Sequence, residues 1–301
     1  MLWGMLPVAL KELLAGMDAI TIVWYRFFAA GIVLFAWLTI QRKIPQILRQ
    51  AAQIKWFLLF AAIGLCINYF LFSYSLNFVN GETSEAVIQL TTLFLILGGV
   101  FLYKEPFLAV QKVGTGLIIC GLLLFFNDRL SGFLSLENRE TIGVIIVVFA
   151  AITWAVYALL QKQLLNSFSS VQILFLIYAF SSIALLPFIS PLSLFQLSEI
   201  QVYLLLFCCL NTIIAYGCFA EALNCWDASK VSAVLALAPL FTIGSLKLLV
   251  FFQPDYAFSD RLSMLSLLGA FLLVVGSALT ALMPVFQQYR ANKRGALTES
   301  V

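Results

Sequence analysis

Long apolar runs, separated by short groups of charged and turn-forming residues, set the pattern of this chain. Between Lys55 and Glu82 lie 26 residues without a formal charge, and a second such run extends from Ala86 to Tyr103. A run of about 20 apolar residues can cross the hydrocarbon core of a bilayer as a helix. This stretch therefore predicts two membrane helices joined by a short acidic turn.

The same pattern along the whole chain predicts helices rather than a membrane barrel, whose strands would alternate apolar and polar residues. Turn residues and charges divide the chain into ten predicted spans, at residues 1–14, 19–40, 56–78, 83–103, 108–126, 141–161, 171–189, 201–223, 229–251 and 263–285. Within the fifth and tenth spans, the pairs Gly114/Gly121 and Gly269/Gly276 have the same spacing. Such small-residue stripes predict close helix packing.

The third and fourth spans recur 147 positions later without a gap, with Tyr69 matching Tyr216 and Asn77 matching Asn224. An internal match of this length indicates a duplication. We therefore predict an all-α integral membrane protein of two five-helix repeats, residues 1–126 and 141–285, with a linker at 127–140 and a polar, unstructured tail at 286–301. Five is an odd number, so the two repeats are expected to be inverted in the membrane, as in many transporters.

Composition agrees with a membrane protein, because 63% of the residues are hydrophobic and only 10% are charged. Soluble domains carry about 25% charged residues. The chain has no histidine, which removes the commonest metal ligand and general base. We expect no enzyme, no catalytic residue, no metal site and no cofactor. The net charge of +3 gives no reason to expect a nucleic-acid partner.

Positive charges gather in alternate connections of the predicted spans. Arg42, Lys43, Arg49 and Lys55 follow the second span, and Arg290, Lys293 and Arg294 follow the tenth. Because cytoplasmic loops are rich in lysine and arginine, both termini are predicted to be cytoplasmic. When Trp3 is set on Trp154, the sixth span has about 13 residues ahead of the tryptophan where the first has two. The sequence is therefore expected to lack about half of its first membrane helix.

Several of these features resemble the drug/metabolite transporter superfamily, in particular its EamA-type ten-span members. They are the duplicated architecture, Trp3-Gly4 with Pro7 and Lys11, and Tyr103-Lys104-Glu105-Pro106. In the second half Phe251-Phe252-Gln253-Pro254 stands where that pattern has a glutamate, so Glu105 has no counterpart there. The resemblance implies a multi-pass inner-membrane carrier, often an exporter of amino acids or other small metabolites, with a cavity lined mostly by spans 1, 3, 4, 6, 8 and 9.

Ionisable residues inside predicted spans are candidates for function, because each costs about 2.5 to 3.5 kcal/mol on insertion scales. Glu221 is the candidate for proton coupling or cation recognition, with an interface carboxylate as the alternative. Lys247 and Lys11 are candidates for binding an anion, although Lys247 could instead reach the outer interface. Arg26 is interpreted as a peripheral anchor in preference to a functional residue.

Polar stripes complete the predicted cavity. Glu85, Gln89 and Thr92 share one helix face, and so do two further sets in the third and sixth spans. Each stripe could serve contacts between helices or line a cavity. Pro239 is the candidate hinge, since proline interrupts helical hydrogen bonding. The candidate cavity residues are Trp3, Lys11, Tyr69, Ser73, Tyr74, Asn77, Gln89, Thr92, Trp154, Tyr157, Glu221 and Lys247.

The sequence has no nucleotide-binding motif, which favours a secondary carrier. We predict a secondary active exporter of small metabolites such as amino acids, working by alternating access, with protons as one option for the coupling ion. An exchanger of organic anions or phosphorylated metabolites is the alternative if Lys11, Arg26 and Lys247 converge on the cavity. A non-transporting assembly subunit is the alternative of another class. The expected partners are a small-molecule substrate and the lipid bilayer, with the chain as a monomer or a homodimer.

Overall fold

The computed structural model describes residues 2–104, 106–129, 137–225 and 234–298, and every regular element in these ranges is helical. The helices are α1 (Leu2–Leu13), α2 (Ala19–Ile40), α3 (Ala52–Ser75), α4 (Gly81–Ile88), α5 (Leu90–Tyr103), α6 (Ala109–Phe125), α7 (Arg139–Leu164), α8 (Ser170–Leu185), α9 (Glu199–Cys225), α11 (Ala238–Phe252) and α12 (Met264–Thr298). Short 3₁₀ turns lie at Ile47–Arg49, Leu186–Phe188 and Pro191–Gln196. The all-helical prediction is confirmed.

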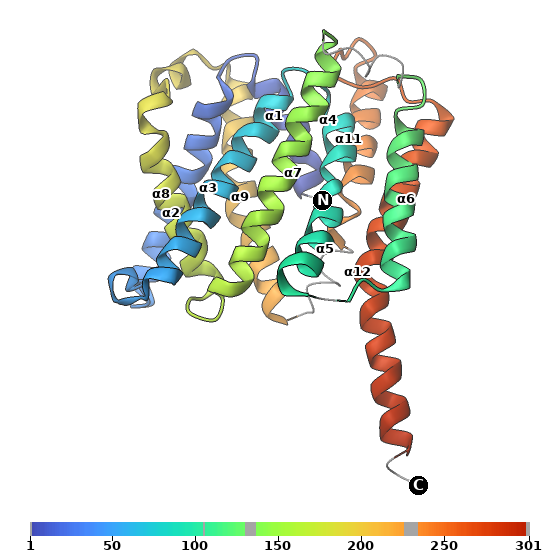
Figure 1. Ribbon diagram of the computed structural model, residues 1–301. Coiled ribbons are helices and arrows are strands. Elements are labelled where there is room, and N and C mark those ends of the chain that lie inside the picture. Colours follow the sequence, from blue (N-terminus) through green and yellow to red (C-terminus); the bar gives the residue numbers. More distant parts are fainter. Residues whose placement is uncertain (1, 105, 130–136, 226–233, 299–301) are drawn as a thin grey trace.

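Seven helical segments of the described chain are long and apolar enough to cross a membrane, and α4 with α5 forms one of them. Two shorter apolar helices, α6 and α11, accompany them. Figure 1 shows the helices side by side in one bundle, with α12 continuing well beyond its edge. The outward-facing surface carries large apolar side chains such as Phe101 and Phe149, which are 75% and 57% exposed. An exterior with many exposed apolar side chains suits contact with lipid.

The C-terminal tail is a correction to the sequence-based expectation. We predicted no structure after residue 286, yet α12 continues as a helix to Thr298, and residues 299–301 lie outside the described ranges. Extending an existing helix costs far less than starting one, and the alanine, arginine, lysine and leucine of this segment are good helix formers.

Local sequence explains where several helices begin and end. Asp18 caps α2 by accepting from the Thr21 backbone N–H over 2.9 Å, and Ser169 caps α8 together with Gln172. Side-chain acceptors at these positions satisfy backbone donors that have no partner within the helix. At the other end of a helix, Lys104 adopts a left-handed conformation with φ 55° and closes α5. Pro106 follows two residues later, as is common after a helix end.

Two glycine pairs hold α6 against α12. A Cβ atom on Gly114 would lie 2.7 Å from the carbonyl oxygen of Gly276, and one on Gly121 would lie 2.8 Å from that of Gly269. These distances leave no room for a side chain, so the two backbones are in direct contact. The predicted packing role of both stripes is confirmed.

Two predicted spans are interrupted in their first half. Gln89 separates α4 from α5 in the fourth span. In the ninth span a turn at residues 236–237 precedes α11, and residues 229–233 lie outside the described chain. Pro239 lies in the first turn of α11, where its missing N–H removes no helical hydrogen bond. Its role as a hinge stays a prediction.

Candidate functional site

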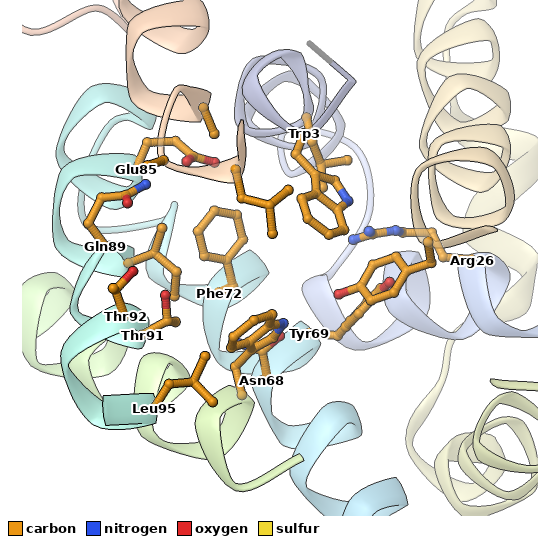
Figure 2. A pocket seen from close by; sticks show the side chains of 17 residues that line it. Trp3, Arg26, Asn68, Tyr69, Phe72, Glu85, Gln89, Thr91, Thr92 and Leu95 are labelled. Carbon is orange, nitrogen blue, oxygen red and sulfur yellow. The ribbon is translucent and has the colours of Figure 1, made fainter. Parts of the chain in front are cut away.

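A cavity of about 140 Å³ lies in the middle of the bundle, beside the interruption at Gln89. We call it the central cavity (Figure 2). Side chains from α1, α2, α3, α4, α5, α7 and α9 line it, together with the segment around the turn before α11. The lining residues are Trp3, Leu6, Arg26, Asn68, Tyr69, Phe72, Glu85, Ile88, Gln89, Thr91, Thr92, Leu95, Trp154, Tyr216, Leu235, Ala236 and Ala238.

One wall of the central cavity is polar and comes from α4 and α5. Figure 2 shows Glu85, Gln89, Thr91 and Thr92 together on this side. Glu85 is only 5% exposed, and the part of the chain that the structure describes holds no ion-pair partner for it. Gln89 accepts a hydrogen bond from Oγ of Ser277 over 3.3 Å. That bond ties the interrupted segment to α12.

Arg26 of α2 forms the opposite wall. Its side chain is buried, and Nε donates to Oγ1 of Thr212 on α9 over 3.0 Å. The guanidinium carbon lies 4.4 Å from the centre of the Tyr69 ring, within the range of a cation–π contact. Among the described residues no carboxylate lies within 4.0 Å of this guanidinium. The cavity therefore has a buried cation in its wall without an anionic partner from those residues.

Aromatic rings fill the space between these walls. The Trp3 and Tyr216 ring centres lie 5.0 Å apart, and those of Tyr69 and Tyr216 lie 5.6 Å apart. Such offset contacts fix the rings relative to one another. Asn68, lower in the cavity, donates to the Ala150 carbonyl over 2.9 Å and joins α3 to α7. The interior is thus amphipathic, with apolar rings between two charged groups.

At one end of the bundle, the N-terminus of α4 meets the segment between α11 and α12. Glu82, 1% exposed, accepts from Ser259 Oγ over 2.7 Å and from the Asp260 backbone N–H over 3.2 Å. The Asp260 carboxylate in turn accepts from Asn80 over 3.0 Å and from Thr83 over 2.7 Å. We call this group the polar latch; its members are Asn80, Glu82, Thr83, Arg129, Lys247, Ser259 and Asp260.

Five of the twelve predicted cavity residues line the central cavity, namely Trp3, Tyr69, Gln89, Thr92 and Trp154. The other seven lie elsewhere, and they are Lys11, Ser73, Tyr74, Asn77, Tyr157, Glu221 and Lys247. The coupling candidate Glu221 is an exposed residue of α9. Because the central cavity gathers only some of the predicted residues, the assignment of the other seven to substrate binding remains a prediction.

The two lysines of this second group are occupied by other contacts. Lys11 Nζ donates to the carbonyl oxygens of Leu76 and Val79, just beyond the end of α3. Lys247 Nζ donates to the Asp260 carbonyl over 2.7 Å, within the polar latch. Cations near a helix C-terminus stabilise its unpaired carbonyl groups. Lys11 therefore has a structural role that its sequence position did not indicate.

The remaining members are packed or peripheral. Tyr157 and Ser73 are completely buried, and Tyr157 belongs to the apolar cluster of α2, α3, α7 and α8. Tyr74 and Asn77 line a separate hollow beside the connection of α1 to α2. Ser73, Tyr74 and Tyr157 share a helix with cavity residues, and Asn77 follows the end of α3. None of these four residues lines the central cavity.

Sequence reasoning missed several lining residues, chiefly Arg26, Asn68, Phe72 and Glu85. A signal existed for Glu85, since it starts the polar stripe that continues through Gln89. Tyr216 could also have been found, as the repeat partner of Tyr69. Arg26 was placed in the cavity only by the anion-exchanger alternative, because an arginine one or two turns into a predicted helix is typical of an interface anchor.

The EamA-like transporter family matches the chain twice, over residues 1–127 and 141–282. This chain belongs to the EamA-like transporter family. It is 40% identical to the Escherichia coli K12 protein called "Uncharacterized inner membrane transporter YhbE", over 93% of this chain and 88% of that protein. This confirms the resemblance seen in the sequence, and the membrane character that the composition predicted fits a multi-pass member of a transporter family.

Two more distant comparisons agree with this membership. An E. coli K12 protein called "Probable amino-acid metabolite efflux pump" is 23% identical, over 71% of this chain and 73% of its own length. A solved structure described as "Crystal structure of protein" superposes with a TM-score of 0.64 at 18% identity, over 94% of this chain and 93% of that one. At this identity the superposition shows a shared fold alone.

Proposed function

We propose that this chain is a secondary carrier that exports small metabolites, such as amino acids or related compounds, across the inner membrane by alternating access. The observation that carries the proposal is the central cavity, a chamber with polar and aromatic walls at an interruption of a membrane helix. Carriers place their substrate sites near mid-membrane, where interrupted helices expose backbone groups. The name of the 23% identical relative, an efflux pump for amino-acid metabolites, supports the direction and substrate class.

The mechanism that we propose needs ten spans arranged as two inverted repeats, residues 1–126 and 141–285. The glycine contacts support this arrangement. Gly114 faces Gly276, and Gly121 faces Gly269. The first glycine of each stripe thus contacts the second glycine of the other stripe. This pattern is expected for two equivalent helices related by a two-fold axis.

The lining of the central cavity supports the same symmetry. Ile88, Gln89 and Thr91 line it, and so do the residues 147 positions later, Leu235, Ala236 and Ala238. The two interrupted segments therefore contribute equivalent positions to the same cavity. In an alternating-access cycle, the two repeats would exchange conformations and move the opening from one face to the other.

We assign the described conformation to a state closed on the predicted outer side. The polar latch joins α4 to the α11–α12 connection there. A second cavity of about 360 Å³ shares Trp3 and Ala238 with the central cavity and extends along α9 to Ala222, near the predicted cytoplasmic end. Both termini are proposed to be cytoplasmic, and the chain to act as a monomer or a homodimer.

The alternative of an anion exchanger depended on three cations in one site. Only Arg26 lines the central cavity, whereas Lys11 and Lys247 bind backbone carbonyl groups elsewhere. The geometry therefore favours a carrier for metabolites with a single anionic group over one for multiply charged phosphates. Proton coupling remains part of the proposal, with Glu221 and Glu85 as the two carboxylates to be compared.

The test is flux in liposomes that contain the purified protein. Radiolabelled amino acids and related metabolites are loaded inside, and their exit is followed with and without an imposed pH gradient. Protein-free liposomes give the background rate. We expect at least one solute to leave the liposomes faster than this background rate. Its exit should be faster still when the proton gradient is directed inward, opposite to the movement of the solute. Exit no faster than background for every solute would contradict it.

A further inference from the structure

The guanidinium of Arg26 is a buried cation that the described residues leave without a counter-ion. Its side chain is 2% exposed, and Thr212 accepts from Nε alone. Guanidinium carries five N–H donors, and in Figure 2 its other nitrogens lie at the edge of the central cavity beside Tyr69. A buried charge is stable only when an opposite charge or several hydrogen bonds compensate it. An anionic group in the cavity would supply that compensation.

Glu85, on the opposite wall of the central cavity, is a buried acidic residue that also has no partner of opposite charge among the described residues. The residue is 5% exposed and lines the same cavity without an ion pair in the described part of the chain. Figure 2 shows Glu85 and Arg26 on opposite walls, with Trp3 and Phe72 between them. The two charges therefore cannot neutralise each other by direct contact. Each faces the cavity with unused hydrogen-bonding capacity.

Both charges belong to the first half of the chain. At the offset that sets Trp3 on Trp154, Arg26 corresponds to Ile177, and at the offset of 147 Glu85 corresponds to Ser232. The aromatic residues, in contrast, recur as the pairs Trp3/Trp154 and Tyr69/Tyr216. The two charged residues of the cavity are therefore not explained by the duplication. They make its two walls chemically different, so that an asymmetric ligand can bind in one orientation.

From this arrangement, and resting on the carrier function proposed above, we propose that the central cavity recognises an elongated amino acid with a carboxylate at one end and a cationic amine at the other. Arg26 binds a carboxylate through paired N–H donors, in the geometry that guanidinium and carboxylate share. Glu85 binds a cationic amine at the far end of the molecule, and the apolar chain between the two lies along Phe72 and Trp3. The solute class is that of the diamino acids, in which a second cationic amine lies several carbon atoms from the carboxylate and its neighbouring α-ammonium.

The experiment measures binding to the purified protein with three probes of matched shape. L-lysine has both charged ends, L-norleucine lacks the terminal amine, and cadaverine lacks the carboxylate. The wild type is expected to bind L-lysine at least tenfold more tightly than either other probe. Arg26→Gln should lower the affinity for L-lysine and for L-norleucine at least tenfold and leave the affinity for cadaverine unchanged. Glu85→Gln should lower the affinity for L-lysine and for cadaverine and leave the affinity for L-norleucine unchanged.

Arg26→Lys serves as the conservative variant, because it keeps the charge and loses the paired donors; it should restore part of the L-lysine affinity. Equal affinities of the wild type for the three probes, or no binding of any, would overturn the inference. So would a loss in Arg26→Gln that is the same for every probe, since that pattern indicates a structural defect. If the protein transports only solutes without this charge pattern, the carrier function still holds and only the proposed diamino-acid site is refuted.

Discussion

Nε of Arg26 donates a hydrogen bond to Oγ1 of Thr212 over 3.0 Å, and both side chains are buried. The bond joins α2 to α9, two helices from different halves of the sequence. It also holds the guanidinium over the Tyr69 ring, 4.4 Å from the ring centre. The guanidinium that we propose to bind the ligand is thus held in position before the ligand binds.

Thr212→Val is expected to destabilise the protein and to weaken binding at Arg26. Removing the hydroxyl leaves a buried charged donor unpaired, which costs about 1 to 3 kcal/mol. Denaturant titration in micelles measures the free energy of unfolding, and probe binding measures the affinity. Thr212→Ser keeps the acceptor and is the control. If valine and serine behave alike, the hydrogen bond has no such role.

Gly276→Ala is expected to lower the free energy of unfolding by about 1 to 3 kcal/mol, the usual cost of overpacking. Its Cβ atom would lie 2.7 Å from the Gly114 carbonyl oxygen and 2.9 Å from the Ile118 backbone nitrogen. Because these are backbone atoms, they cannot avoid the Cβ atom by changing a side-chain rotamer, so the helices would have to move apart. The matched control is Gly116→Ala on α6, where a Cβ atom meets no atom within 4 Å. Similar losses in both variants would refute the close-contact explanation.

Asp260→Ala is expected to loosen the polar latch. The substitution removes the acceptor for Asn80 and Thr83 at the start of α4. Deuterium uptake, followed by mass spectrometry, should rise in the segments 79–88 and 253–263 and stay unchanged in α2 and α8. Asp255→Ala, in the same connection but exposed, is the control. A latch that contributes nothing would give identical uptake in the two variants.

Lys11→Met is expected to reduce stability without changing substrate affinity. The lysine donates to the carbonyl oxygens of Leu76 and Val79, and loss of these charged hydrogen bonds costs about 1 to 3 kcal/mol. Thermal unfolding reports the first effect and probe binding the second. The opposite result, weaker binding at unchanged stability, would return Lys11 to the cavity role that its sequence position predicted.

Glu85→Gln and Glu221→Gln separate the two candidates for proton coupling. Glu85 lines the central cavity, whereas Glu221 is exposed on α9. A coupling carboxylate has to meet both proton and substrate, so Glu85→Gln should remove the effect of a pH gradient on efflux. Efflux by Glu221→Gln should keep that effect. The reverse pattern in liposome flux would make Glu221 the coupling residue.

The sequence alone determined the helical membrane architecture, most helix positions and the small-residue faces of α6 and α12. These properties depend on local features. A run of apolar residues forms a helix wherever it lies, Lys104 and Pro106 end one without help from distant residues, and small residues seven apart mark one face. The match of residues at an offset of 147 is also a property of the chain as written.

Only the tertiary structure decided which charges belong to the site. The sequence favoured Lys11 and Lys247 as cavity residues and Arg26 as a peripheral anchor, whereas the structure places only Arg26 in the lining of the central cavity. Their roles differ because distant segments supply the partners: the end of α3 for Lys11, the α11–α12 connection for Lys247, and Thr212 for Arg26. Helical periodicity fixes the face on which a side chain lies. It cannot say which other helix packs against that face, because that choice depends on the fit of the whole bundle.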